Sequence, residues 1–311
     1  MPNLVGIGNS QVPTNAMLGG LAYQDPAHAV LTNVEPGDIA AIKAKTADTA
    51  VDVFVYDTRK DSDGGAWRKK TSHTSWYNEG ESETRGARKE FPAVAVIVVE
   101  SNATTIYDAD DPNLSMWMKF ITTTGGDKIF NRPQHWNSSS AFALNGIICI
   151  GNGAGSAEST CVLNYVSDSV RLYPIDGYPT YGGDYSLGIG ERSGSTGAFK
   201  TISQNIYGDE AFDVAMTVLP NAPINPATGL PIPTIAAATA AGTSIIKDNG
   251  TVVDVYTYNH GYVAFDDAYN LIIGRNDGPI LYGGPIPAVD IAETSWRAQN
   301  DVTYFGDGGN V

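Results

Sequence analysis

Short apolar segments joined by turn-forming residues recur along the chain from about residue 50 onward. Residues 51–56 carry an apolar side chain at every second position, and residues 57–65 break that pattern with charges and glycines. Four later stretches share one layout, in which a nearly all-apolar strand, a turn of Gly, Asn or Asp and a second strand follow one another. These stretches span residues 93–108, 143–173, 234–255 and 262–282. The pattern predicts a series of antiparallel strand pairs.

Composition agrees with strands joined by tight turns. Good helix formers are scarce, whereas the 311 residues include 34 Gly, 17 Pro and 16 Tyr. The pair Asn249-Gly250 is the strongest hairpin signal, because both residues tolerate the positive φ of a type I′ turn. We therefore predict an all-β fold.

Two all-β architectures fit the pattern, a β-propeller-like array of small antiparallel sheets and a β-sandwich. Sandwich strands keep an apolar-in, polar-out alternation, whereas the inner strands of propeller blades are covered on both faces and lose it. Residues 93–99 and 147–150 do not alternate, which favours the propeller. A closed ring needs about four to eight blades. Because few are visible, we expect a part of a longer polypeptide, or a ring completed by other subunits.

The first 45 residues differ from the rest. Residues 6–15 are polar, turn-rich and without period, and residues 35–45 (EPGDIAAIKAK) form the best short helix in the chain. We predict an extended docking segment over 1–45 and a propeller-like domain over 46–311. Val12, Pro13 and Tyr23 are the candidate docking residues.

Net charge excludes several partners. The chain carries a formal charge of −15, so nucleic acid and anionic lipid would be repelled over most of its surface. The basic residues at 67–70 and at Arg85, Arg88 and Lys89 have aromatic neighbours that could stack on bases, but a solvated loop or subunit contact is favoured. No apolar run approaches the ~20 residues that cross a bilayer, and the N-terminus does not resemble a secretion signal. We expect synthesis and retention in a cytoplasm, with Cys149 and Cys161 as free thiols.

An acidic loop and several aromatic residues are the candidate binding groups. Asp57, Asp61 and Asp63 resemble a fragment of a calcium loop, although the spacing does not fit an EF-hand and a plain acidic turn is favoured. Trp67, Trp76 and Tyr77 could stack on sugar rings, as could other tryptophans. The alternative is that the tryptophans fill gaps between sheets, and this alternative is favoured.

Catalytic motifs are missing from the sequence. The four histidines lie outside any zinc or nucleophile-elbow motif, and for His73 a structural hydrogen bond within its loop is favoured. Gly188-Ile189-Gly190 lacks the third glycine of a dinucleotide site. We expect neither an enzyme nor a cofactor.

Several stretches resemble a known group of proteins. Residues 61–79 (DSDGGAWRKKTSHTSWYNE), 84–96 and 105–112 closely resemble uncharacterised structural proteins of marine phages, notably cyanophages. The opening, residues 6–26, is similar to the start of many marine phage tail and fibre proteins, and later segments at 213–233 and 242–254 extend the similarity.

The resemblance implies a location in the virion, association with the tail or tail fibre and assembly with other tail proteins through repeated copies. It supplies no activity. A structural virion protein is therefore the first functional hypothesis. The alternatives are a receptor-binding protein that recognises a host surface glycan and, less favoured, a polysaccharide depolymerase.

Overall fold

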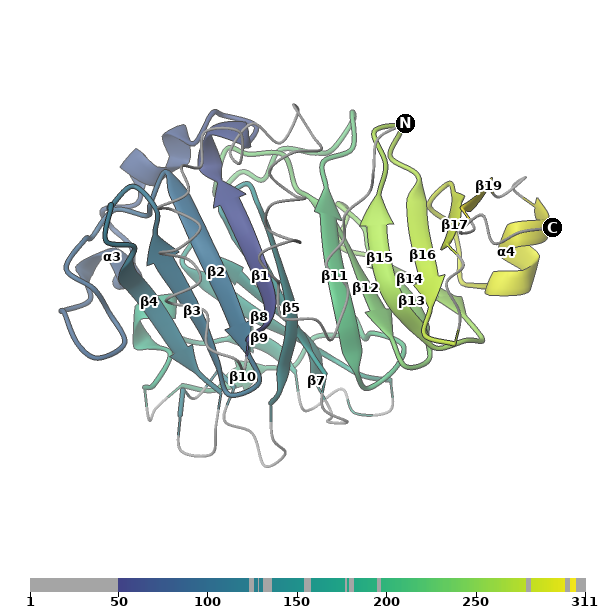
Figure 1. Cartoon of the computed structure of the whole chain (residues 1–311), viewed down its shortest axis with the longest axis horizontal. Coiled ribbons are helices and arrows are strands. Elements are labelled where there is room, and N and C mark those ends of the chain that lie inside the picture. Colours follow the sequence, from purple (N-terminus) through teal and green to yellow (C-terminus); the bar gives the residue numbers. More distant parts are fainter. Residues whose placement is uncertain are drawn as a thin grey trace.

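The computed structural model describes residues 50–305 except 123–125, 128, 131–135, 154–157, 177, 179–181, 195–196, 278–280 and 300–302. The described chain is all-β and folds into four sheets, here called blades 1 to 4 (Figure 1). The predicted helix at 35–45 and the docking residues Val12, Pro13 and Tyr23 lie outside the described residues.

Blades 1 and 2 occupy the first part of the described chain. Blade 1 has the order β1-β2-β3-β4 and blade 2 the order β10-β9-β8-β7-β6-β5, and all pairs are antiparallel. The strands of blade 1 are β1 (Ala50–Asp57), β2 (Val94–Glu100), β3 (Ala103–Asp108) and β4 (Ser115–Ile121). Those of blade 2 are β5 (Ser138–Leu144), β6 (Ile147–Asn152), β7 (Glu158–Asn164), β8 (Ser169–Pro174), β9 (Gly183–Tyr185) and β10 (Phe199–Lys200).

Blades 3 and 4 follow, with the orders β11-β12-β13-β14-β18 and β15-β16-β17-β19. Among the pairs of described strands, only the short β14–β18 pair is parallel, and an isolated parallel bridge joins Ile175 to Ile206. The strands are β11 (Ala211–Thr217), β12 (Thr234–Thr239), β13 (Gly242–Ile246), β14 (Val252–Tyr256), β18 (Ile291–Ala292), β15 (His260–Phe265), β16 (Leu271–Arg275), β17 (Leu281–Gly284) and β19 (Thr303–Phe305). The helical turns are η2 (Thr58–Lys60), η3 (Ala66–Lys70), α3 (Ser75–Asn78), η4 (Ile189–Glu191) and α4 (Glu293–Gln299).

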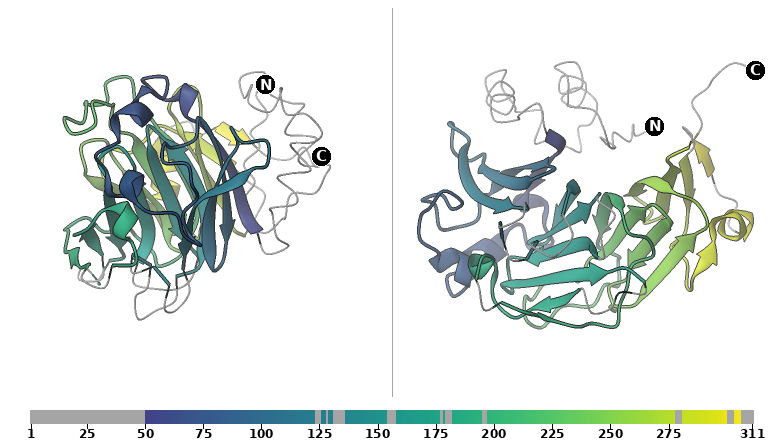
Figure 2. Two further views of the ribbon diagram at one scale, coloured as in Figure 1. Left: turned by 90° about the vertical axis from the view of Figure 1, so that its left-hand side faces the viewer. Right: turned by 90° about the horizontal axis from the view of Figure 1, so that it is seen from below.

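The blades stand face to face like the blades of a propeller. The first strands pack in succession, β1 on β5, β5 on β11 and β11 on β15. The second view of Figure 2 shows a curved row, with blade 1 at one end and blade 4 at the other. One apolar core joins blades 1 and 2, a second joins blades 2 and 3, and a third joins blades 3 and 4. Each of the two middle blades is therefore covered on both faces.

The side chains of the non-alternating strands are buried on both faces, as predicted, but these strands are not innermost. Ala95, Ile97 and Val99 of β2 face the core shared with blade 2, while Val96 and Val98 face the other side. In every blade the nearly all-apolar strand is the second one, with neighbours on both edges. The first strands, which contact one another along the row, combine apolar residues with polar ones such as Asp52, Ser140 and Asp213. The β-sandwich alternative does not describe this arrangement.

The hairpin predicted at Asn249-Gly250 joins β13 to β14. Gly250 adopts a positive φ of 82° and its N–H donates to the Lys247 carbonyl at 2.8 Å, but Asn249 is not left-handed. The connection is thus a type I turn followed by a left-handed glycine, not the expected type I′ turn.

Cys149 and Cys161 are free and fully buried. Cys149 pairs with Val162 and Cys161 with Ile150, so the two thiols point to opposite faces of blade 2. The expectation of two unbridged thiols is confirmed. No helix among the described residues is long and apolar enough to span a bilayer.

Candidate functional site

The connection between β1 and β2 spans residues 58–93 and contains most of the candidates named from the sequence. It forms η2, η3 and α3 and reaches from blade 1 to the outer turns of blade 2 (Figure 1). We call this connection the clamp loop. Its side chains were candidate binding groups, with packing and a plain acidic turn as the favoured interpretations.

Trp67 and Trp76 are fully buried, so the less favoured interpretation, in which they stack on sugars, does not describe them. They extend the core between blades 1 and 2, where the Trp76 ring lies 5.5 Å from the Trp117 ring. Each indole N–H is satisfied internally, that of Trp76 by the Tyr165 carbonyl at 2.9 Å and that of Trp67 by Asp61 at 2.7 Å. The gap-filling alternative is the correct one for these tryptophans. Tyr77 is only partly buried and packs against the same core.

Asp57, Asp61 and Asp63 do not form a cation site. Asp57 accepts from the Arg59 guanidinium at 2.7 Å, and Asp63 accepts from the Gly65 N–H at 3.1 Å. Asp61 is buried, and its carboxylate accepts from Tyr56, Trp67 and Asn145. Within the described part of the chain, no three His, Cys, Asp or Glu side chains converge as a metal site would require.

Asp61 instead holds the clamp loop to blade 2. Its carboxylate accepts from the Tyr56 hydroxyl at 2.5 Å and from the Asn145 N–H at 2.7 Å, while the Tyr56 oxygen accepts from the Gly146 N–H at 2.7 Å. Burial raises the pKa of the Asp61 carboxyl, and these donors oppose that shift. Asn145 and Gly146 form the left-handed turn between β5 and β6. A Cβ on Gly146 would lie 2.5 Å from Val166, which explains the glycine.

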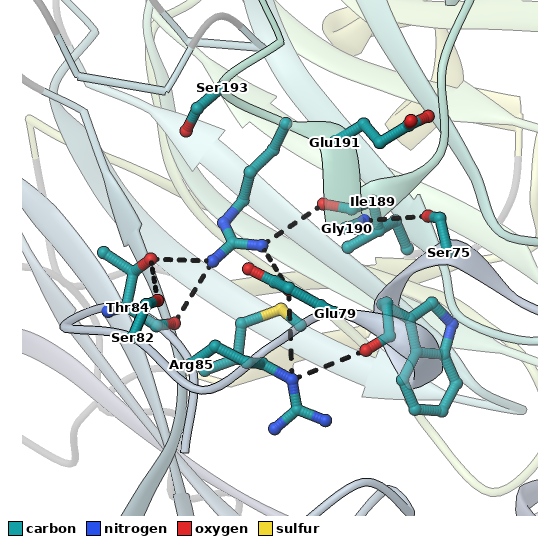
Figure 3. Close-up of polar contacts among 12 residues, drawn as sticks. Ser75, Glu79, Ser82, Thr84, Arg85, Ile189, Gly190, Glu191 and Ser193 are labelled. Carbon is teal, nitrogen blue, oxygen red and sulfur yellow. Dashed lines mark hydrogen bonds and ion pairs between the residues drawn. The ribbon is translucent and has the colours of Figure 1, made fainter. Parts of the chain in front are cut away.

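A buried ion cluster lies at the other end of the clamp loop (Figure 3). Arg85 and Arg192 are 1% and 2% exposed, and Glu79 lies between them. The Glu79 carboxylate is 2.8 Å from the Arg192 guanidinium and 3.9 Å from that of Arg85. Asp127 is 3.6 Å from Arg192, so two guanidiniums face two carboxylates.

Backbone and ring contacts complete the cluster. Arg192 donates to the Thr84 carbonyl at 3.2 Å, and Arg85 donates to the Trp117 carbonyl at 2.8 Å. The Arg85 guanidinium also lies 4.5 Å from the centre of the Trp117 ring. Burial lowers the pKa of Arg85, while Glu79 opposes the shift. Because most of their guanidinium donors are bonded within the protein, with the buried Arg192 Nε as an exception, the two arginines fasten blade 1 to the η4 turn of blade 2.

An open polar pocket of about 560 Å³ lies beside this cluster. It is lined by His73, Thr74, Ser75, Asn78, Ser167, Asp168, Ser169, Tyr185, Ser186, Leu187, Gly188 and Glu191. The Ser75 hydroxyl donates to Asp168 at 2.9 Å and accepts from the Gly190 N–H at 2.9 Å. His73 contacts the carbonyl of Lys70 at 3.1 Å, as its structural interpretation predicted. Ser75 and His73 therefore do not form a nucleophile–base pair.

The Gly188-Ile189-Gly190 run is a close contact between α3 and η4. A Cβ on Gly188 would lie 2.1 Å from the Ser75 hydroxyl, and one on Gly190 would lie 2.6 Å from the Ser75 backbone. The glycines let the two turns touch, which fits their interpretation as turn residues and not as part of a nucleotide site.

A second polar group, which the sequence analysis missed, lines the centre of the row. Each first strand has a register shift near its start, at Ala50/Asp52, Ser138/Ser140, Ala211/Asp213 and His260/Tyr262. Asp52 accepts from the Ala141 N–H of blade 2 at 2.9 Å, and Asp213 accepts from the Val263 N–H of blade 4 at 3.0 Å. Asp213 also accepts from the Ser140 hydroxyl at 3.0 Å. The register shifts at equivalent positions of the four strands would have pointed to these polar residues, but they become apparent only when the blades are compared in three dimensions.

We call Asp52 and Asp213 the axial carboxylates. Burial is the main cause of the raised pKa of each. Burial raises the pKa of Asp52 to about 6, and burial together with the nearby Asp52 raises the pKa of Asp213 to about 7. The backbone and serine donors oppose the shifts without cancelling them. The two side chains bridge neighbouring blades and are sensitive to pH near neutrality.

Comparisons with known proteins give only distant similarities. No protein-family model matches the sequence, and no curated protein matches it. One similar solved structure is Hsv2 of Kluyveromyces lactis, with 8% identity over 61% of this chain and 46% of that chain and a TM-score of 0.27. Another is a humanized mutant of the Chaetomium thermophilum Polycomb Repressive Complex 2, with 11% identity, 67% and 37% coverage and a TM-score of 0.32. The chain spans less than half the length of either.

Proposed function

We propose that this chain is a non-enzymatic structural protein of a bacteriophage tail or tail fibre, with a role in scaffolding and assembly. The observation that carries the proposal is that the polar side chains of the clamp loop are bonded within the protein itself. In the clamp loop, Asp61 and Arg85 are buried and Glu79 is partly buried, and all three are bonded to other parts of the chain. Such a network stiffens the contact between two blades and leaves these groups unavailable to a substrate.

The resemblance to marine phage structural proteins supports the same proposal. Its most specific stretches, residues 61–79 and 84–96, are the clamp loop and the start of β2. A sequence kept similar in that region preserves a blade-to-blade contact. A rigid contact between blades is a feature that a structural subunit needs.

The proposed partners are other virion tail proteins and further copies of this chain, and the proposed location is the virion. Residues 1–45 would anchor the chain to a neighbouring component. Further copies would be held together by symmetric interfaces. Sugar recognition through Trp67 and Trp76 is not part of the proposal, because both side chains are buried.

Genetic complementation tests the proposal. A phage that carries an epitope-tagged full chain should yield purified virions containing the tag in several copies per particle. A chain that lacks residues 1–45 should be expressed but absent from the particles. Tagged chain that stays in the lysate supernatant while infectious virions form without it would refute the structural role. Incorporation of the truncated chain would refute the anchor alone.

A further inference from the structure

The face of blade 1 that points away from blade 2 is apolar. We call it the blade 1 outer face. It consists of the buried residues Ala50, Val96, Val98 and Leu114 with the partly buried Val53, Val55, Tyr107 and Ala109. Every described member of this cluster belongs to blade 1, whereas each of the other three apolar clusters joins two blades.

The central residues of this face are nevertheless out of water. Val96 and Val98 are each 2% exposed. Side chains in the middle of an uncovered sheet face stay accessible, because a neighbour on the same sheet shields only their flanks. The blade 1 outer face therefore needs a covering layer, and a few apolar side chains are enough to supply it.

The chain itself leads to this face. Ala50 begins β1, is 3% exposed and belongs to the outer-face cluster, so the segment before it ends at the face. Residues 35–45 (EPGDIAAIKAK) carry the helix predicted from the sequence, and only residues 46–49 separate it from Ala50. Four extended residues reach at most about 14 Å, which keeps such a helix close to the face.

Size and pattern also fit. A helix of eleven residues is about 16 Å long, and four strands form a surface about 15 Å across. Ile39 and Ile42 are three positions apart and would share one side of the helix, while Ala41 and Ala44 would lie on the opposite side. The isoleucines provide the two apolar side chains that the face requires.

We propose that residues 35–45 form an amphipathic helix that covers the blade 1 outer face of the same chain, with Ile39 and Ile42 packed over Val96 and Val98. Residues 1–34 stay available for contact with a neighbour. The inference does not depend on the virion role. A chain without residues 1–34 would lose the anchor and keep the cover, so the two proposals can fail separately.

Thiol labelling of the purified full chain tests the cover. In a Val98→Cys variant, the new thiol should react with a maleimide at least ~10-fold more slowly than the exposed thiol of Ser82→Cys. Adding Ile39→Asp and Ile42→Asp should remove that protection, because the charges cannot be buried against valine. Cys149 and Cys161 are buried and serve as the blank.

The matched control places the same charges on the other side of the helix. Ala41→Asp with Ala44→Asp should leave Val98→Cys protected. Fast labelling of Val98→Cys in the otherwise unchanged chain would overturn the proposal, as would protection that survives the isoleucine changes. Protection that disappears on dilution would assign the cover to a second copy and would also overturn it.

A second measurement does not depend on stability. Mild oxidation of an Ile42→Cys, Val98→Cys chain at low concentration should give an intramolecular disulfide, detected by peptide mass spectrometry. The Ala44→Cys, Val98→Cys chain should not form one, because its thiols would face apart. Equal cross-linking of the two chains, or none in either, would contradict the proposed seat of the helix.

Discussion

Asp213 should make the protein less stable at pH 8 than at pH 5, and Asp213→Asn should remove much of that difference. Burial and the nearby Asp52 raise the pKa of Asp213 from its ordinary 3.8 to about 7. The folded state therefore holds a proton that the unfolded chain releases between these values. The stability contributed by Asp213 is fully present below about pH 4 and is lost as pH rises through about 7.

The size of the effect follows from the shift. The whole shift of about three pH units amounts to about 4 kcal/mol, and the part lost between pH 5 and pH 7, about two units at about 1.4 kcal/mol each, sets an upper limit of about 3 kcal/mol for the difference between pH 5 and pH 8. The side chain keeps some contact with solvent, so we expect about 2 kcal/mol. Asparagine has the size of the neutral acid and can still accept from the Val263 N–H.

Urea unfolding followed by tryptophan fluorescence at pH 5, 6, 7 and 8 measures this difference. The free energy of unfolding of Asp213→Asn should fall less from pH 5 to pH 8 than that of the unchanged chain, by about 2 kcal/mol. Asp267→Asn removes an exposed carboxylate and should leave the pH dependence unchanged. Parallel curves for the unchanged chain and Asp213→Asn would refute the assignment of a raised pKa to Asp213.

Three further predictions concern the clamp loop and its contacts, each checked by the urea midpoint at pH 7. Glu79→Gln leaves two buried guanidiniums short of a counter-charge and should cost about 3 kcal/mol, against less than ~0.5 for the exposed Glu81→Gln. Gly146→Ala should cost at least ~2 kcal/mol because its Cβ meets Val166. Gly64→Ala, also at positive φ but in open space, should cost only about 1. Trp76→Ala should cost ~3–5 kcal/mol by leaving a cavity between blades 1 and 2, and a change below ~1 would contradict its place in that core.

The fold class and most strand pairs could be predicted from the sequence because they depend on local patterns. Residues 93–99 are apolar at every position, and a strand with this pattern must be covered on both faces wherever it lies. The pattern could not say that β2 is the second strand of its blade. The order of strands in a sheet depends on which edges meet neighbouring blades, and β1 carries that contact despite its polar Asp52.

The candidate site could be predicted in location but not in role. Trp67, Trp76 and the acidic residues do lie at one junction of the fold. Tryptophan has the same chemistry whether it stacks on a sugar or fills a core. Trp76 packs against Tyr165 and Trp67 against Phe91, and these partners are not adjacent to them in the sequence. Arg192 was missed for the same reason. Nothing near it in the sequence indicates a partner, because Glu79 lies 113 positions away.

The role of the axial carboxylates could not be predicted from the sequence for a different reason. Asp52 looks like the polar position of an alternating strand, and such residues normally face water. The bulge at the start of β1 turns it toward the Ala141 N–H of the next blade. A one-residue irregularity in strand register leaves no trace in the hydrophobic pattern, so the link between blades becomes visible only in three dimensions.

Electron cryomicroscopy of the intact phage particle tests the central claim most directly. The account predicts repeated copies of a four-bladed curved density on the tail, with the clamp loop buried between the first two blades of each copy. A map in which every tail density is assigned to other chains, with no peptides of this chain in the purified particles, would contradict it.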